Sequence, residues 1–92
     1  MQIDFDPVKS EKNRRERGLP FERTIEFDWG DATFTEDERY LYPERRFVAI
    51  GYLRKRLHVI CFTLIPGGVR IISFRKASVR EAKDHGKTIT ID

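Results

Sequence analysis

The chain has 92 residues, of which 39% are hydrophobic and 12% aromatic, so it can bury one small core and is too apolar to be a disordered chain. A single cysteine excludes a disulfide framework, and no apolar stretch approaches the roughly 20 residues that a membrane-spanning helix needs. Because the first residues are too charged for a signal peptide, we expect a single domain over residues 1–92 in the cytoplasm, with no membrane contact.

The net charge of +3 is unevenly distributed along the chain. Residues 1–46 hold nine basic and twelve acidic side chains, whereas residues 47–92 hold nine basic and only three acidic ones. A polyanion would therefore approach the second half, and the acidic segment 22–44 would face elsewhere. The competing interpretation is that these charges only keep a small domain soluble.

The N-terminal part predicts a strand followed by two helices. Alternation over residues 3–5 indicates a short strand. Asp6 can cap a helix whose first residue is Pro7, and Gly18 is suited to the left-handed conformation that follows a helix end. Residues 19–29 begin with Leu-Pro and predict a second short helix with inward aromatic and aliphatic side chains.

Residues 30–44 predict an exposed, loop-rich connection with a strand at 32–35. From Arg45 the pattern changes to three β-rich runs, at residues 45–53, 57–65 and 69–75, separated by the short breaks RKR and PGG. Three such runs joined by tight turns are typical of an antiparallel meander.

The chain then predicts a last helix, because Ser78 and Glu81 have the spacing of a capping box and Gly86 is a natural stop. Together these elements predict an α+β fold, in which a small antiparallel meander of three or four strands packs with two N-terminal helices and a C-terminal helix.

Symmetric turns in the meander would place Tyr52 opposite His58 and Ile65 opposite Val69. One face would then stack Ile50, Ile60 and Phe74, and the reverse face would carry Arg75 beside Gly51 and Val59. A slip of one residue in either turn would exchange the two faces.

Basic residues are expected to gather at one end of this meander, where the first turn lies beside the end of the third run. Such a group suits phosphate recognition, because guanidinium groups bind phosphate oxygens in pairs. The alternative is that basic turn residues are merely solvated. The candidate group is Arg54, Lys55, Arg56, His58, Arg75, Lys76 and Arg80.

The sequence contains no glycine-rich phosphate loop, no CxxC or HExxH motif and no metal-ligand spacing, so we expect no metal and no nucleotide cofactor. Metal-free RNA cleavage would need a base, an acid and cations for the charge that develops on phosphorus. Arg75 fits charge stabilisation, Lys76 and Arg80 could clamp flanking phosphates, and His58 is the candidate base or acid. Tyr52 could stack a base, and Ser73 is a further candidate RNA contact.

Structural interpretations compete with these roles. Cys61 fits a small strand residue better than a nucleophile, and His85 fits a cation at the end of a helix. The rival to an enzyme is a non-catalytic basic module that holds nucleic acid or a partner protein through the same rim.

Two motifs resemble the BrnT toxins of bacterial type II toxin-antitoxin modules: F-D-P-x-K-x-x-x-N from Phe5 to Asn13, and I-S-x-R-x-A-S-x-x-E from Ile72 to Glu81. The resemblance covers about residues 3–83. The sequence differs in two places: Arg17 stands where the family usually has a histidine, and the ending KTITID is atypical.

The resemblance implies a RelE-like fold and a ribonuclease that arrests translation. It also implies neutralisation by a BrnA-type antitoxin with a ribbon-helix-helix domain, in an assembly expected to be a heterotetramer. Operator DNA would be bound only through that antitoxin.

Overall fold

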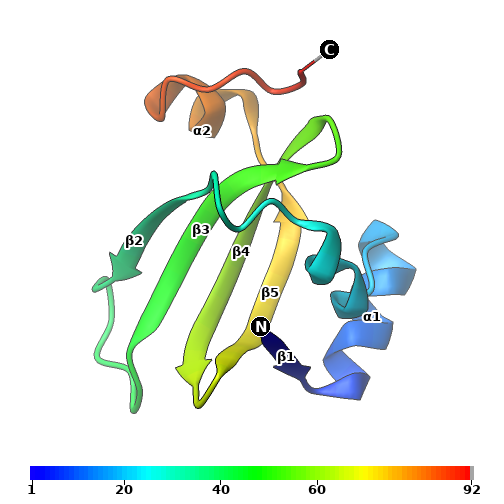
Figure 1. Cartoon of the computed structure of the whole chain (residues 1–92), viewed down its shortest axis with the longest axis vertical. Helices are drawn as coiled ribbons and strands as arrows, with labels where there is room; N and C mark the ends of the chain where they lie inside the picture. The colour runs from blue at the N-terminus through cyan, green and yellow to red at the C-terminus, as the bar shows by residue number, and fades with distance from the viewer. Residues whose placement is uncertain (92) are drawn as a thin grey trace.

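The computed structural model describes residues 1–91 and shows five strands in one mixed sheet, with the order β1-β5-β4-β3-β2 (Figure 1). The strands are β1 (Gln2–Phe5), β2 (Thr33–Asp37), β3 (Arg46–Leu53), β4 (Arg56–Ile65) and β5 (Gly68–Lys76). The helical segments are α1 (Pro7–Arg17), the 3-10 helix η1 (Phe21–Glu26) and α2 (Val79–Asp84).

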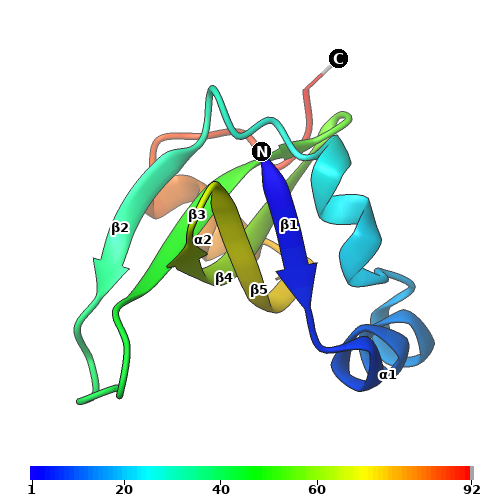
Figure 2. The ribbon, with the colours of Figure 1, turned by 60° about the horizontal axis from the view of Figure 1, so that its bottom comes forward.

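This architecture contradicts the predicted fold class. The sheet has five strands rather than three or four, and it is mixed because β1 pairs in parallel with β5 (Figure 2). Of the two predicted N-terminal helices, only α1 is an α-helix, and the second is a single 3-10 segment. The parallel pairing was not predicted because β1 and β5 are 66 residues apart in the chain, with Gln2 opposite Gly68, and no local pattern indicates such a contact.

Local helix signals were read correctly from the sequence. The Asp6 side chain accepts a hydrogen bond from the Val8 backbone at 2.9 Å, and Gly18 ends α1 with a φ of 70°. At α2 the Ser78 and Glu81 side chains each bind the other's backbone N–H, which is a complete capping box.

The predicted register is wrong by one residue at the first hairpin. Tyr52 lies opposite Leu57, and Gly51 lies opposite His58. The cause is the turn, which has two residues rather than three: Arg54 adopts a left-handed φ of 54° and Leu53 pairs with Arg56. Because turn length sets register, this one residue places Tyr52 and His58 on opposite faces of the sheet.

The second hairpin is also one residue shorter than expected, with Ile65 opposite Gly68 across a turn in which Gly67 has a φ of 77°. A β-bulge then restores the predicted pairing further along: Phe62 pairs with Ile71 but Cys61 pairs with Ser73. Ile72 is the unpaired extra residue, so Arg75 does lie opposite Val59 as expected.

Two cores lie on the two faces of the sheet. Helix α1, η1 and the segment that follows η1 cover part of one face, called here the first face, over a core that includes Phe21, Phe62 and Phe74. On the second face, α2 and the C-terminal segment cover one end of the sheet, where Leu57, Val59 and Ala82 are buried. No helix within residues 1–91 is long and apolar enough to cross a membrane.

Candidate nucleic-acid interface

A basic groove of about 360 Å³ lies where the β3–β4 turn meets the end of α1, the start of η1 and the end of β5. Six lysines and arginines and one histidine line it, and among residues 1–91 no carboxylate does. Its neutral wall comes from Gly18, Leu19, Leu53 and Thr90. The charged members are Arg17, Arg23, Arg54, Lys55, Arg56, His58 and Lys76.

His58 is the group in the groove that can exchange a proton near neutral pH. Its ring is buried against Phe74, with ring centroids 5.5 Å apart, and Nδ1 lies 2.7 Å from the backbone oxygen of Arg56. Because a carbonyl oxygen only accepts, Nδ1 carries the proton, which leaves Nε2 of the neutral ring as an acceptor.

The surroundings of His58 favour its neutral form. Burial lowers the pKa of His58, and the hydrogen bond to the Arg56 backbone opposes that shift. The nearby charges of Arg56, Lys76 and Arg23 lower the pKa further. The imidazole is therefore poised as a base at neutral pH rather than as a permanent cation.

Asn13 ties α1 to the groove. Its side-chain nitrogen donates to the backbone oxygens of Leu19 at 2.6 Å and Phe74 at 2.8 Å, and its oxygen accepts from Nη1 of Arg17 at 2.9 Å. A buried amide thus fixes the cation at the end of α1 while satisfying two main-chain acceptors.

Three further arginines are held by main-chain or carboxylate partners. Arg56 donates to the backbone oxygen of Ala77 at 2.8 Å, which fixes its guanidinium beside the end of β5. Arg54 and Arg23 both lie 3.2 Å from Glu26, and these hydrogen bonds lower the pKa of that carboxyl. Each of these three cations therefore has a partner within the protein.

Arg75 lies on the second face, away from His58. Its guanidinium binds both carboxylate oxygens of Glu81, at 2.7 and 2.8 Å. This pair lowers the pKa of Glu81 to about 2, against the opposing effect of burial, and raises the pKa of Arg75. A hollow of about 330 Å³ shared with Arg17, Leu19 and Lys76 connects Arg75 to the groove region at the end of β5.

The remaining predicted site residues are dispersed. Arg80 is exposed on α2, where its Nε lies 3.9 Å from Asp84. The Tyr52 hydroxyl donates to the backbone oxygen of Thr88 at 2.8 Å on the second face, and Ser73 lies opposite Cys61 on that face. The structure thus brings together five of the predicted residues: Arg54, Lys55, Arg56, His58 and Lys76.

Sequence reasoning missed Arg17 and Arg23 as members of this group. Their only local signal was their position near helix ends, and basic residues there are common on solvated surfaces.

Within residues 1–91 no group of three metal-ligating side chains occurs. Burial raises the pKa of Cys61, so its thiol is held in the unreactive protonated form.

Comparison with known proteins gives one positive result. A search of curated proteins found no match. A family model described as the ribonuclease toxin, BrnT, of type II toxin-antitoxin systems matches residues 5–81, which include α1, η1, the strands β2 to β5 and only the last residue of β1. Type II toxins of this kind imply an antitoxin partner. The chain therefore belongs to the BrnT family of ribonuclease toxins.

Proposed function

We propose that the chain is an endoribonuclease that cleaves RNA without a metal ion, with the sugar-phosphate backbone lying in the basic groove. The supporting observation is the groove itself: six cationic side chains surround one histidine whose pKa is lowered, and no carboxylate of residues 1–91 lines the same space. Such a field attracts phosphate and leaves a neutral imidazole beside it.

In this proposal Nε2 of His58 removes the proton from a ribose 2′-hydroxyl. The 2′-oxygen then bonds to the adjacent phosphorus and the bond from phosphorus to the 5′-oxygen breaks, which leaves a 2′,3′-cyclic phosphate. Lys76, opposite His58 in the ladder, donates a proton to the leaving 5′-oxygen. Arg17 and Arg56 stabilise the negative charge on the phosphorane.

The other predicted residues take supporting places. Arg54 and Lys55 in the exposed turn contact flanking phosphates, and the hollow shared by Arg75 and Lys76 gives the RNA a path across the end of β5. We assign no RNA contact to Tyr52, because its hydroxyl is engaged by the segment after α2. Arg80 and Ser73 lie outside the groove and are secondary candidates.

The decisive experiment incubates the purified protein with single-stranded RNA in EDTA. We expect cleavage that persists in EDTA and leaves 2′,3′-cyclic phosphate ends, and that is lost in His58→Gln. Cleavage that requires added Mg²⁺ would contradict the metal-free mechanism. Saturable binding with no cleavage under any condition would instead support the non-catalytic basic module.

We also propose that the antitoxin is a BrnA-type protein with a ribbon-helix-helix domain, which assembles with the toxin as a heterotetramer and alone contacts operator DNA. Family membership supports this proposal. Expression of the toxin alone should slow growth and co-expression of the antitoxin should restore it. Normal growth with abundant folded toxin would count against toxicity.

A further inference from the structure

The outer edge of β2 is available for pairing. β2 ends the sheet, and four of its five residues are exposed. Within the described chain, its backbone pairs with β3 on one side only. An edge strand of this kind is a template for a strand from another chain.

Helices α1 and η1 lie on the side of β5 and β1 and leave the β2 side of the sheet without a helix over it (Figure 1). An apolar stripe of side chains begins at this edge on the first face. Phe34 in β2 is 48% exposed and lies edge-on to Phe62, with ring centroids 6.2 Å apart. Phe47 stacks on the same ring at 5.8 Å, and Leu64, two residues beyond Phe62 on β4, is 64% exposed. Phe62 itself is buried beneath Trp29, with ring centroids 5.4 Å apart, so the exposed apolar surface of the stripe lies at Phe34 and Leu64.

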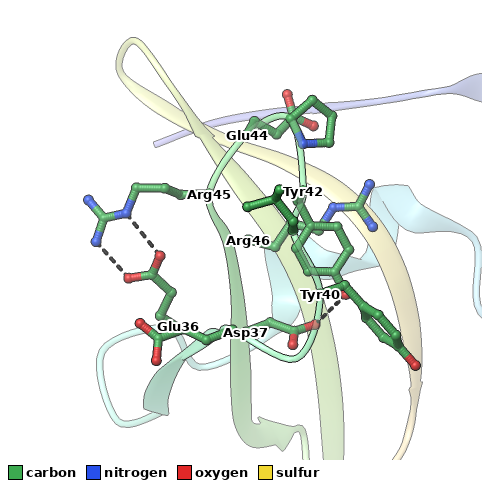
Figure 3. Close-up of a pocket in the computed structure, with 10 residues that line it drawn as sticks. Glu36, Asp37, Tyr40, Tyr42, Glu44, Arg45 and Arg46 are labelled. Atoms are coloured by element: carbon green, nitrogen blue, oxygen red, sulfur yellow. Dashed lines mark hydrogen bonds and ion pairs between the residues drawn. The ribbon is translucent and has the colours of Figure 1, made fainter.

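Side chains of the loop beside the edge bind one another, as Figure 3 shows for Asp37 and Tyr42. The Tyr42 hydroxyl donates to Asp37 at 3.0 Å, and the guanidinium of Arg46 lies 4.2 Å from the centroid of the Tyr42 ring. Arg39 binds both oxygens of Asp37 and holds the pKa of that carboxyl well below its usual range. These contacts fix the loop that follows β2, so a partner would meet an ordered surface.

The charged residues around β2 indicate which kind of partner this edge can bind. Asp31 precedes β2 and Glu38 follows it, and neither makes an ion pair within residues 1–91, whereas Glu36 is already neutralised by Arg45 at 2.7 Å. Uncompensated carboxylates at both ends repel RNA. They also oppose pairing of β2 with β2 of a second copy, which would bring like charges together.

We propose that the β2 edge and the Phe34 stripe form the docking surface for an extended segment of the antitoxin, with alternating apolar side chains over Phe34 and basic residues near Asp31 and Glu38. The segment adds a sixth strand to the sheet. The inference rests on family membership and the geometry of β2, and is independent of the assignment of His58 in the groove. It places the anchor of the antitoxin on a different surface from the basic groove.

The test measures binding of the purified cognate antitoxin, encoded with this chain, to matched charge variants. We expect Phe34→Lys and the double change Asp31→Lys/Glu38→Lys each to raise the dissociation constant about tenfold or more, as for an interface anchor. Val79→Lys, at a 73% exposed aliphatic residue on α2, and Asp84→Lys should stay within about twofold. Melting curves identify any variant that fails to fold.

Hydrogen exchange of the wild-type complex provides a second measurement that needs no variant. The outward amides of β2 should exchange rapidly in the free toxin and become protected when the antitoxin binds. Unchanged exchange in β2, or equal affinity of all four variants, would overturn the proposal. So would protection of β2 by self-association of the toxin or by RNA. RNA cleavage by free Phe34→Lys should equal that of the wild type, which separates this test from that of the proposed function.

Discussion

Replacing Arg75 with alanine removes the paired hydrogen bonds that connect β5 to α2. The pKa of Glu81 is about 2 instead of about 4.5, and a shift of that size would correspond to roughly 3 kcal/mol in a dry site. The two side chains are 40% and 31% exposed, so water screens the pair. We therefore expect a coupling of about 1–2 kcal/mol, above that of an exposed pair because the contact has two hydrogen bonds.

The assay is a double-mutant cycle of urea unfolding for Arg75→Ala, Glu81→Ala and both together. The free energy of unfolding should fall by about 1–2 kcal/mol in Arg75→Ala, which for a domain of this size lowers Tm by roughly 5–10 °C. The exposed pair Arg80 and Asp84, 3.9 Å apart, is the matched control and should show almost no coupling.

The contribution of the Arg75–Glu81 pair to the free energy of unfolding should decrease at acidic pH. The folded-state pKa of Glu81 is depressed, so its contribution is complete above its ordinary pKa near 4.5 and is lost as pH falls towards about 2. Glu81→Gln should lack this component. A coupling near zero would refute a structural role for the pair. Full stability of Arg75→Ala together with complete loss of RNA cleavage would assign Arg75 to catalysis instead.

Three other perturbations test the groove and the fold. His58→Gln should lower RNA cleavage about 100-fold or more with little change in affinity. Because the His58 pKa is lowered, the acidic inflection of the wild-type rate should lie below the ordinary histidine pKa of 6.5, and Arg23→Gln should move that inflection upward. Asn13→Ala leaves two buried main-chain carbonyls without their donor and should lower the free energy of unfolding by about 2–4 kcal/mol in urea titrations; a loss under half a kcal/mol would contradict the buried network. Gly68→Ala would place a Cβ 1.8 Å from the backbone oxygen of the residue paired with it in β1, so β1 should lose its protection from hydrogen exchange, whereas Gly30→Ala, whose nearest atom is 3.7 Å away, should be neutral.

Features that depend on neighbouring residues could be predicted from the sequence. The Asp6 cap, the left-handed Gly18 and the capping box of Ser78 and Glu81 each need only three or four adjacent residues, and each was confirmed. The positions of the three β-rich runs could be predicted from local composition in the same way. The family could be recognised from the two motifs near the ends of the matched segment.

Features that depend on distant residues were decided by the tertiary structure. The parallel pairing of β1 with β5 turned an expected antiparallel meander into a mixed five-stranded sheet. A two-residue turn with a left-handed Arg54 shifted the register of the first hairpin by one residue relative to the prediction. Because side chains alternate between faces, that shift placed Tyr52 and His58 on opposite faces of the sheet. Composition fixed which cations the chain carries, but the backbone path determined that Arg17 and Arg23 join His58 while Arg75 binds Glu81 on the other face.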